Sequence, residues 1–219
     1  MMNSRRITRE DRRQMSRLAW PALLENLLST LVQFVDTAMV GALGAAATAA
    51  VAVNTTPTWL VNGLVSAFGV GGTALVARMI GAKDQEGAEE AARQVFLGVL
   101  VLATAIFVVM FSLADRIPVW MQADASLHAD ATRYMRIIAL AFIPHFTGMA
   151  LGAVLRGAGD TRTPMVIAAC ANLLNVIGNY FLIFPPHTAS FLSLPVWGAG
   201  LGVAGAAIST AVSTGLAGL

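Results

Sequence analysis

The sequence predicts an all-α polytopic membrane protein with six transmembrane helices. Of its 219 residues, 57% are hydrophobic and only 12% are charged, whereas soluble domains carry about 25% charged residues. The charges are also clustered, which leaves long apolar stretches between them. Six of these stretches have the roughly 20 residues that a helix needs to cross about 30 Å of hydrocarbon. A bilayer accounts for this pattern better than a soluble core does.

The chain divides into a basic N-terminal segment, residues 1–17, and one six-helix membrane lobe, residues 18–219. The predicted spans, in chain order, are residues 18–43, 46–80, 92–113, 134–155, 164–184 and 198–219. Pro57 inside the second span predicts a kink or a helix that extends beyond the bilayer, because proline removes a backbone hydrogen bond. Before the fifth span, Thr163 is predicted to cap the helix and Pro164 to take its first position.

The distribution of Lys and Arg predicts the orientation of the lobe. The N-terminal segment holds six, the connection between the second and third spans three, and the connection between the fourth and fifth spans two. Because successive connections alternate between the two sides of the membrane, these eleven residues fall on one side and the remaining three on the other. Since cytoplasmic loops carry the excess of basic residues, both termini are predicted to be cytoplasmic, in a multi-pass protein of a bacterial inner (plasma) membrane.

The first span carries a polar stripe. Glu25 and Asp36 are eleven residues apart, about three helical turns, and Ser29 and Gln33 fall on the same side. Ionisable groups within a membrane are costly and tend to be functional. We therefore predict that Asp36 binds a coupling ion, with a structural hydrogen bond to another helix as the alternative. Glu25 and Gln33 are predicted to lie on an ion or substrate pathway, although Glu25 could instead face water at the inner mouth.

The fifth span carries amides on one face. Asn172, Asn175 and Asn179 are spaced three and four residues apart, and Tyr180 follows. Counted from the start of the span, Asn179 lies at a depth near that of Asp36. A carboxylate and amide oxygens at one level can hold a proton or coordinate a hard cation such as Na⁺, so we predict an ion site there. Asn172 and Tyr180 are assigned to the pathway; the alternative is amide hydrogen bonding that joins helices.

Signals of catalysis are absent from the sequence. It contains no phosphate-binding glycine motif, no metal-ligand cluster and no Ser/His/Asp grouping. We therefore predict a protein that is not an enzyme, has no cofactor and no nucleic-acid partner, and draws any pumping from an ion gradient or another subunit.

Several motifs in chain order resemble the multidrug and toxic compound extrusion (MATE) family. They are AWP at residues 19–21, FVDTAMVGALG at 34–44, IGAKD at 80–84, LRGAGDTRTPM at 155–165 and GVAGAAIST at 202–210. The resemblance implies twelve helices in two six-helix lobes, of which this sequence covers the N-terminal one. It also implies export of bulky, often cationic, organic compounds in exchange for H⁺ or Na⁺.

In the family, the first-helix acid, here Asp36, is a coupling-ion residue. Some members pair it with an Asn and an Asp four residues apart in the fifth helix, and these positions fall on Asn175 and Asn179 here. The second carboxylate is therefore missing. This weakens a mechanism in which two carboxylates share a proton, and it leaves a single-carboxylate proton site or a Na⁺ site formed by Asp36, Asn175 and Asn179.

Two other functions are considered. A lipid-linked sugar flippase of the same superfamily should have a cationic interior to hold a pyrophosphate, whereas the interior groups here are acids and amides. A non-transporting fragment is the other alternative, because the second lobe is missing. The expected partners are a small organic substrate, the lipid bilayer, and either a C-terminal lobe or a second copy in a parallel homodimer.

Overall fold

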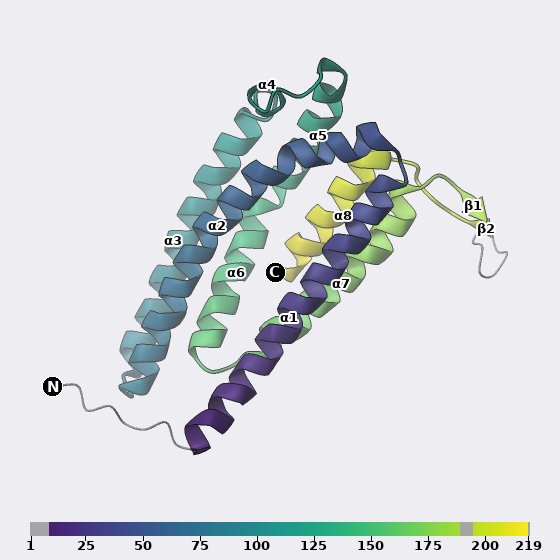
Figure 1. The fold of residues 1–219 in the computed structure, drawn as a ribbon. Helices are drawn as coiled ribbons and strands as arrows, with labels where there is room; N and C mark the ends of the chain where they lie inside the picture. The colour runs from purple at the N-terminus through teal and green to yellow at the C-terminus, as the bar shows by residue number, and fades with distance from the viewer. Residues whose placement is uncertain (1–8, 189–194, 219) are drawn as a thin grey trace.

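The structure is a computed structural model that describes residues 9–188 and 195–218. Its architecture is all-α, as predicted, apart from a short hairpin (Figure 1). The first three helices are α1 (Arg9–Gly41), α2 (Ala45–Gly81) and α3 (Gln85–Ser112). Helix α1 starts within the basic segment, so that residues 9–17 continue the first span. Helix α2 remains one helix across Pro57 and curves along its length (Figure 1).

The fourth span differs from the prediction of one helix over residues 134–155. The chain forms α5 (His128–Leu140) and α6 (Phe142–Gly157), bent by 47° at Ala141. Pro144 explains the break, because its nitrogen cannot donate to the Leu140 carbonyl and its ring crowds that group. Two short elements precede α5, namely α4 (Ile117–Trp120) and the 3₁₀ turn η1 (Ala125–Leu127).

The last part of the chain forms α7 (Arg162–Ile183), the hairpin of β1 (His187–Thr188) and β2 (Pro195–Val196), and α8 (Gly202–Ala217). The two strands pair antiparallel. Among the described residues, α1 from Ala19, α2, α3 and α7 are long and apolar enough to span a membrane. The bent pair of α5 and α6 passes the same test as a fifth span, and α8, with 16 residues, is a shorter apolar helix.

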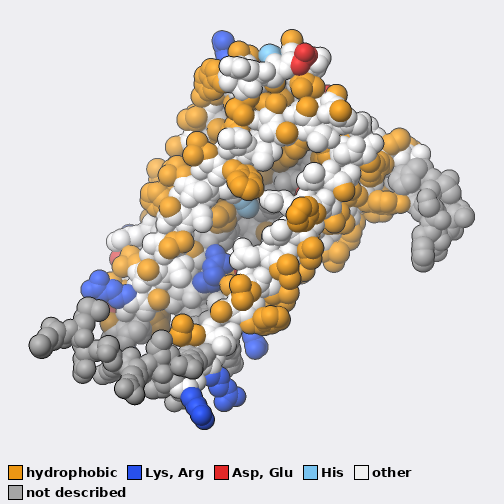
Figure 2. Space-filling view, viewed as in Figure 1, with side chains coloured by type: hydrophobic (Ala, Val, Ile, Leu, Met, Phe, Trp, Pro, Cys, Tyr) orange, Lys and Arg blue, Asp and Glu red, His pale blue; other side chains and the backbone are white. Residues whose placement is uncertain are grey.

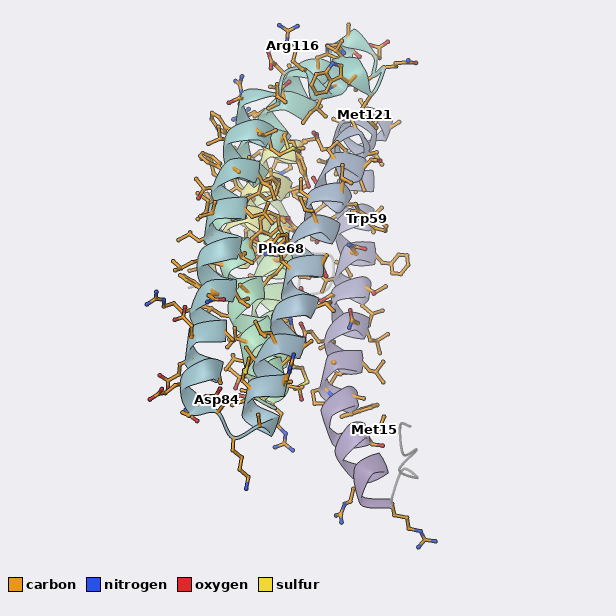
Figure 3. All side chains as sticks on the ribbon, turned by 90° about the vertical axis from the view of Figure 1, so that its left-hand side faces the viewer. Met15, Trp59, Phe68, Asp84, Arg116 and Met121 are labelled. Atoms are coloured by element: carbon orange, nitrogen blue, oxygen red, sulfur yellow. The ribbon has the colours of Figure 1, made fainter. Side chains whose placement is uncertain are left out.

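The helices pack in two groups joined through α8. In one group, α2, α3, α5 and α6 surround the main apolar core, with Val65, Met135 and Phe146 at its centre. In the other, α7 lies between α1 and α8. Helix α8 also contacts α5 and α6 (Figure 1). Large apolar side chains remain on the outside, including Trp59 and Phe68 of α2 (Figure 3), as expected of a surface that faces lipid or another lobe.

Candidate functional site

The candidate site lies where α1, α7 and α8 meet. Helix α1 is packed loosely, since only 6% of its membrane window is buried, and Asp36 is half-buried on the side that faces α7. The predicted placement of Asp36 beside the amides of the fifth span agrees with the structure. Asn175 and Asn179 of α7 are both buried and both reach the Asp36 carboxylate.

Asn179 makes the direct link between the two helices. Its Nδ2 donates to Oδ1 of Asp36 over 2.6 Å. The amide of Asn175 is assigned from its hydrogen-bond network. In the preferred orientation its nitrogen donates to Asp36 Oδ1 and Oδ2, at 2.7 and 3.1 Å, and its oxygen accepts from the Thr210 hydroxyl at 3.1 Å. In the opposite orientation the amide oxygen of Asn175 faces the carboxylate oxygens of Asp36, and this contact between acceptors is unfavourable.

Helix α8 contacts the cluster through two hydroxyl side chains that bond to Asn175. The Ser209 hydroxyl donates to the Asn175 backbone carbonyl over 2.8 Å, and Thr210 bonds to the Asn175 side chain. Gly178 lets the two helices approach, because a Cβ there would lie 2.5 Å from the Ser209 hydroxyl. Sequence reasoning missed Ser209 and Thr210, because it used residues 202–210 only as a family motif. The signal was present as two adjacent hydroxyls after a run of small residues.

The cluster contains one hydrogen-bond acceptor that other side chains of the cluster do not use. Oδ1 of Asn179 is buried and has no hydrogen-bond partner among the described residues. Buried polar atoms are rarely left unpaired, and an uncommitted amide oxygen beside a carboxylate suits a hard cation. The same carboxylate can instead take a proton. Within the described part of the chain, no three His, Cys, Asp or Glu side chains gather to hold a metal ion.

Two of the other predicted pathway residues, Asn172 and Glu25, have partners outside this cluster. Asn172 donates to the Ser29 hydroxyl of α1 over 3.3 Å, nearer the N-terminus of α1. Glu25 lies further along in that direction and pairs with Arg156 of α6, at 3.7 Å. Gln33 is exposed, and its backbone carbonyl accepts from Thr37. The ring of Tyr180 lies edge-on to Phe181.

Membrane-length apolar helices around a carboxylate–amide cluster define the class as an integral membrane protein. The chain belongs to the MatE family, whose family model matches residues 21–181. It is a multi-pass membrane protein, and the resemblance drawn from its motifs is confirmed.

Relatives and solved structures match almost the whole chain. It is 32% identical to a probable multidrug resistance protein NorM of Thermotoga maritima, over 93% of this chain and 42% of that one. It is 28% identical to the uncharacterized transporter YisQ of Bacillus subtilis, over 90% and 41%. A solved transporter of the MOP superfamily from Pyrococcus furiosus superposes with a TM-score of 0.81 at 26% identity, over 94% and 42%. The chain thus spans less than half the length of these relatives.

Proposed function

We propose that this chain is the N-terminal half of a cation-coupled antiporter that exports organic, often cationic, compounds. The observation that carries the proposal is the contact of Asp36 with Asn175 and Asn179, in a chain of the MatE family. The relatives named as multidrug resistance proteins support the substrate class. The membrane would be a bacterial inner membrane, with both termini in the cytoplasm.

Coupling follows from the hydrogen bonds of Asp36. As an ionised acceptor, its carboxylate takes donors from both amides of α7 and so holds α1 against α7. A proton or Na⁺ on the carboxylate competes with those donors, which loosens α1 and favours one of two conformations. Such an ion can drive transport only if it binds the two conformations with different affinity. Asn179 Oδ1 and Asn175 supply further oxygen ligands if the ion is Na⁺.

The test is replacement of Asp36 in the full chain, expressed in bacteria that lack their own drug exporters. Asp36→Asn removes the charge and keeps the shape, and we expect it to abolish resistance to organic cations. Asp115→Asn, in the connection after α3, is the matched control and should keep wild-type resistance. Equal expression of both variants is checked on membranes. Normal resistance in Asp36→Asn would refute the coupling role. No resistance with the wild-type chain, both alone and co-expressed with the C-terminal lobe of a relative, would favour a non-transporting component.

The coupling ion is resolved by the same assay in everted vesicles. Dye uptake that persists without Na⁺ and collapses with the pH gradient indicates H⁺, whereas uptake that requires Na⁺ indicates the oxygen-ligand site. A second lobe is part of this proposal, supplied either by a C-terminal half or by a parallel second copy. Mass measurement of the chain in detergent distinguishes a single copy from a pair.

A further inference from the structure

Glu25 and Arg156 form an ion pair between two helices that belong to different packing groups. Oε1 of Glu25 on α1 lies 3.7 Å from Nη1 of Arg156 on α6, and the two side chains are 24% and 32% exposed. Helix α1 packs chiefly on α7, whereas α6 packs chiefly on α2, α3 and α8. The face drawn in Figure 2 is hollowed between α1 and these helices. The pair therefore bridges an opening rather than reinforcing a packed interface.

The geometry is that of a contact that can open. The N···O distance of 3.7 Å is longer than the 2.7–2.9 Å of a strong charge-assisted hydrogen bond. The ion pair also lacks the two parallel hydrogen bonds that make bidentate Arg–carboxylate contacts rigid. Arg156 also has a favourable place without Glu25. It lies in the last turn of α6, where the helix dipole stabilises a cation, and it borders a cavity with Thr73 and Met149.

Among the described residues, this half of α1 has few other contacts with α6 and packs mainly on α7. Between Glu25 and Asp36, the Ser29 hydroxyl accepts a hydrogen bond from Asn172 of α7 at 3.3 Å. Most large apolar residues along this stretch point outward, among them Leu23, Leu27 and Leu31. The ion pair therefore links this half of α1 to a helix that α1 otherwise hardly contacts.

We propose that Glu25 and Arg156 form a latch, a charge pair that holds the N-terminal half of α1 against α6 and opens when α1 moves. Asp36 lies on the same helix, about 16 Å further along at 1.5 Å per residue. The latch therefore positions the helix that carries the carboxylate, and Glu25 and Arg156 act as positioning residues. The proposal concerns helix positions and does not depend on which ion or substrate the protein carries.

The test measures the distance between α1 and α6 directly. Spin labels are attached through Leu23→Cys and Leu151→Cys, both at exposed positions, in the full chain with Cys170→Ser. Glu25→Gln and Arg156→Gln are each expected to raise the ratio of long to short distances about fivefold, which corresponds to about 1 kcal/mol. Glu25→Arg combined with Arg156→Glu restores opposite charges and should restore the short distance.

Two controls separate the latch from a general loss of structure. Glu90→Gln removes the exposed pair of Glu90 with Arg93 and should leave the distances unchanged. Arg156→Lys keeps the charge and should keep the short distance, even if Arg156→Gln folds poorly. Unchanged distances in both single neutral variants, or a swapped pair as open as those variants, would overturn the proposal. Because no transport is measured, failure here is distinct from failure of the antiporter assay.

Discussion

Asp160 shows how one loop residue sets the start of the helix that carries both site amides. Its Oδ1 accepts from the backbone N–H groups of Arg162 and Thr163, at 2.9 and 3.0 Å, and its Oδ2 accepts from the Thr163 hydroxyl at 2.6 Å. The next residue, Pro164, has no N–H to satisfy. The open donors of the first turn are thus accounted for. We had expected Thr163 to cap and Pro164 to begin the helix, but α7 begins at Arg162.

Replacement of Asp160 is predicted to destabilise the lobe in a pH-dependent way. The hydrogen bonds from Thr163 hold the pKa of the Asp160 carboxyl below its ordinary value of 3.8. A lowered folded-state pKa adds stability at neutral pH, and this stability is lost as pH falls through the folded-state value. Asp160→Ala should lower the Tm by a few degrees at pH 7, with the difference from wild type shrinking between about pH 5 and about pH 3.

The control for this prediction is Asp160→Asn. Its side-chain oxygen still accepts from the two N–H groups, so it should lose less stability than the alanine variant. Thermal unfolding followed by circular dichroism in detergent measures both variants. A deficit of Asp160→Ala that stays constant down to pH 3 would contradict the role of the ionised carboxylate.

At the same scale, the sequence predicted the acid and the two amides of the candidate site but not their supports. The spacing of Asn175 and Asn179 placed both on one helix face, and the depth estimate brought Asn179 level with Asp36. The spacing could not show that Thr210 approaches Asn175, because that contact depends on how α7 and α8 cross. Nor could it show that Gln33 is exposed while Asp36 is half-buried, since both fall on the same side of one helix.

At the scale of elements, the close packing of α7 against α8 depends on small residues. A methyl group at Gly205 would overlap the backbone carbonyl of Leu182, whereas nothing lies within 4 Å of the same position at Gly63 in α2. Overpacking of this kind costs about 1–3 kcal/mol. Gly205→Ala is therefore predicted to destabilise the lobe by about that amount and to disturb Ser209 and Thr210, which follow on the same helix.

Gly63→Ala is the matched control, because it adds the same methyl group in the middle of a helix with free space. It should be neutral or should stabilise by about 0.5–1 kcal/mol, through the lower flexibility of alanine. Unfolding of both variants in detergent against a denaturant gives the comparison. Equal effects of the two substitutions would show that packing at Gly205 is not limiting.

The limits of element prediction are clearest in the fourth span. Composition gave one apolar stretch at residues 134–155, and length alone fitted one helix. The bend at Ala141 follows from Pro144, and the chain end after α8 packs closely here, where a side chain at Gly218 would overlap the Pro144 carbonyl. A hydropathy pattern reports where lipid or protein covers a helix, but it does not report the direction in which the helix runs.

At the scale of the whole molecule, the loops lie at two ends with different charge. The α2–α3 turn, marked by Asp84, lies at the end where α1 begins, near Met15, whereas Arg116 and Met121 lie at the opposite end (Figure 3). Basic side chains gather mainly at the first of these ends (Figure 2). Sequence reasoning could predict this because loop charge is independent of packing. It could not predict which outer faces a second lobe covers, because lipid and protein select similar apolar side chains.

The orientation is predicted to place the basic end in the cytoplasm. In a Cys170→Ser background, single cysteines are introduced at Glu86, at the start of α3, and at Ala125, in the turn η1; both positions are exposed. An impermeant maleimide applied to intact spheroplasts should label Ala125→Cys at once and Glu86→Cys only after permeabilisation. The physical reason is the bias of eleven basic residues against three, which retains the more basic loops on the cytoplasmic side during insertion. Labelling in the reverse order would contradict the charge argument. It would place the N-terminal half of α1, with Glu25, and the end of α6, with Arg156, on the outer side of the membrane.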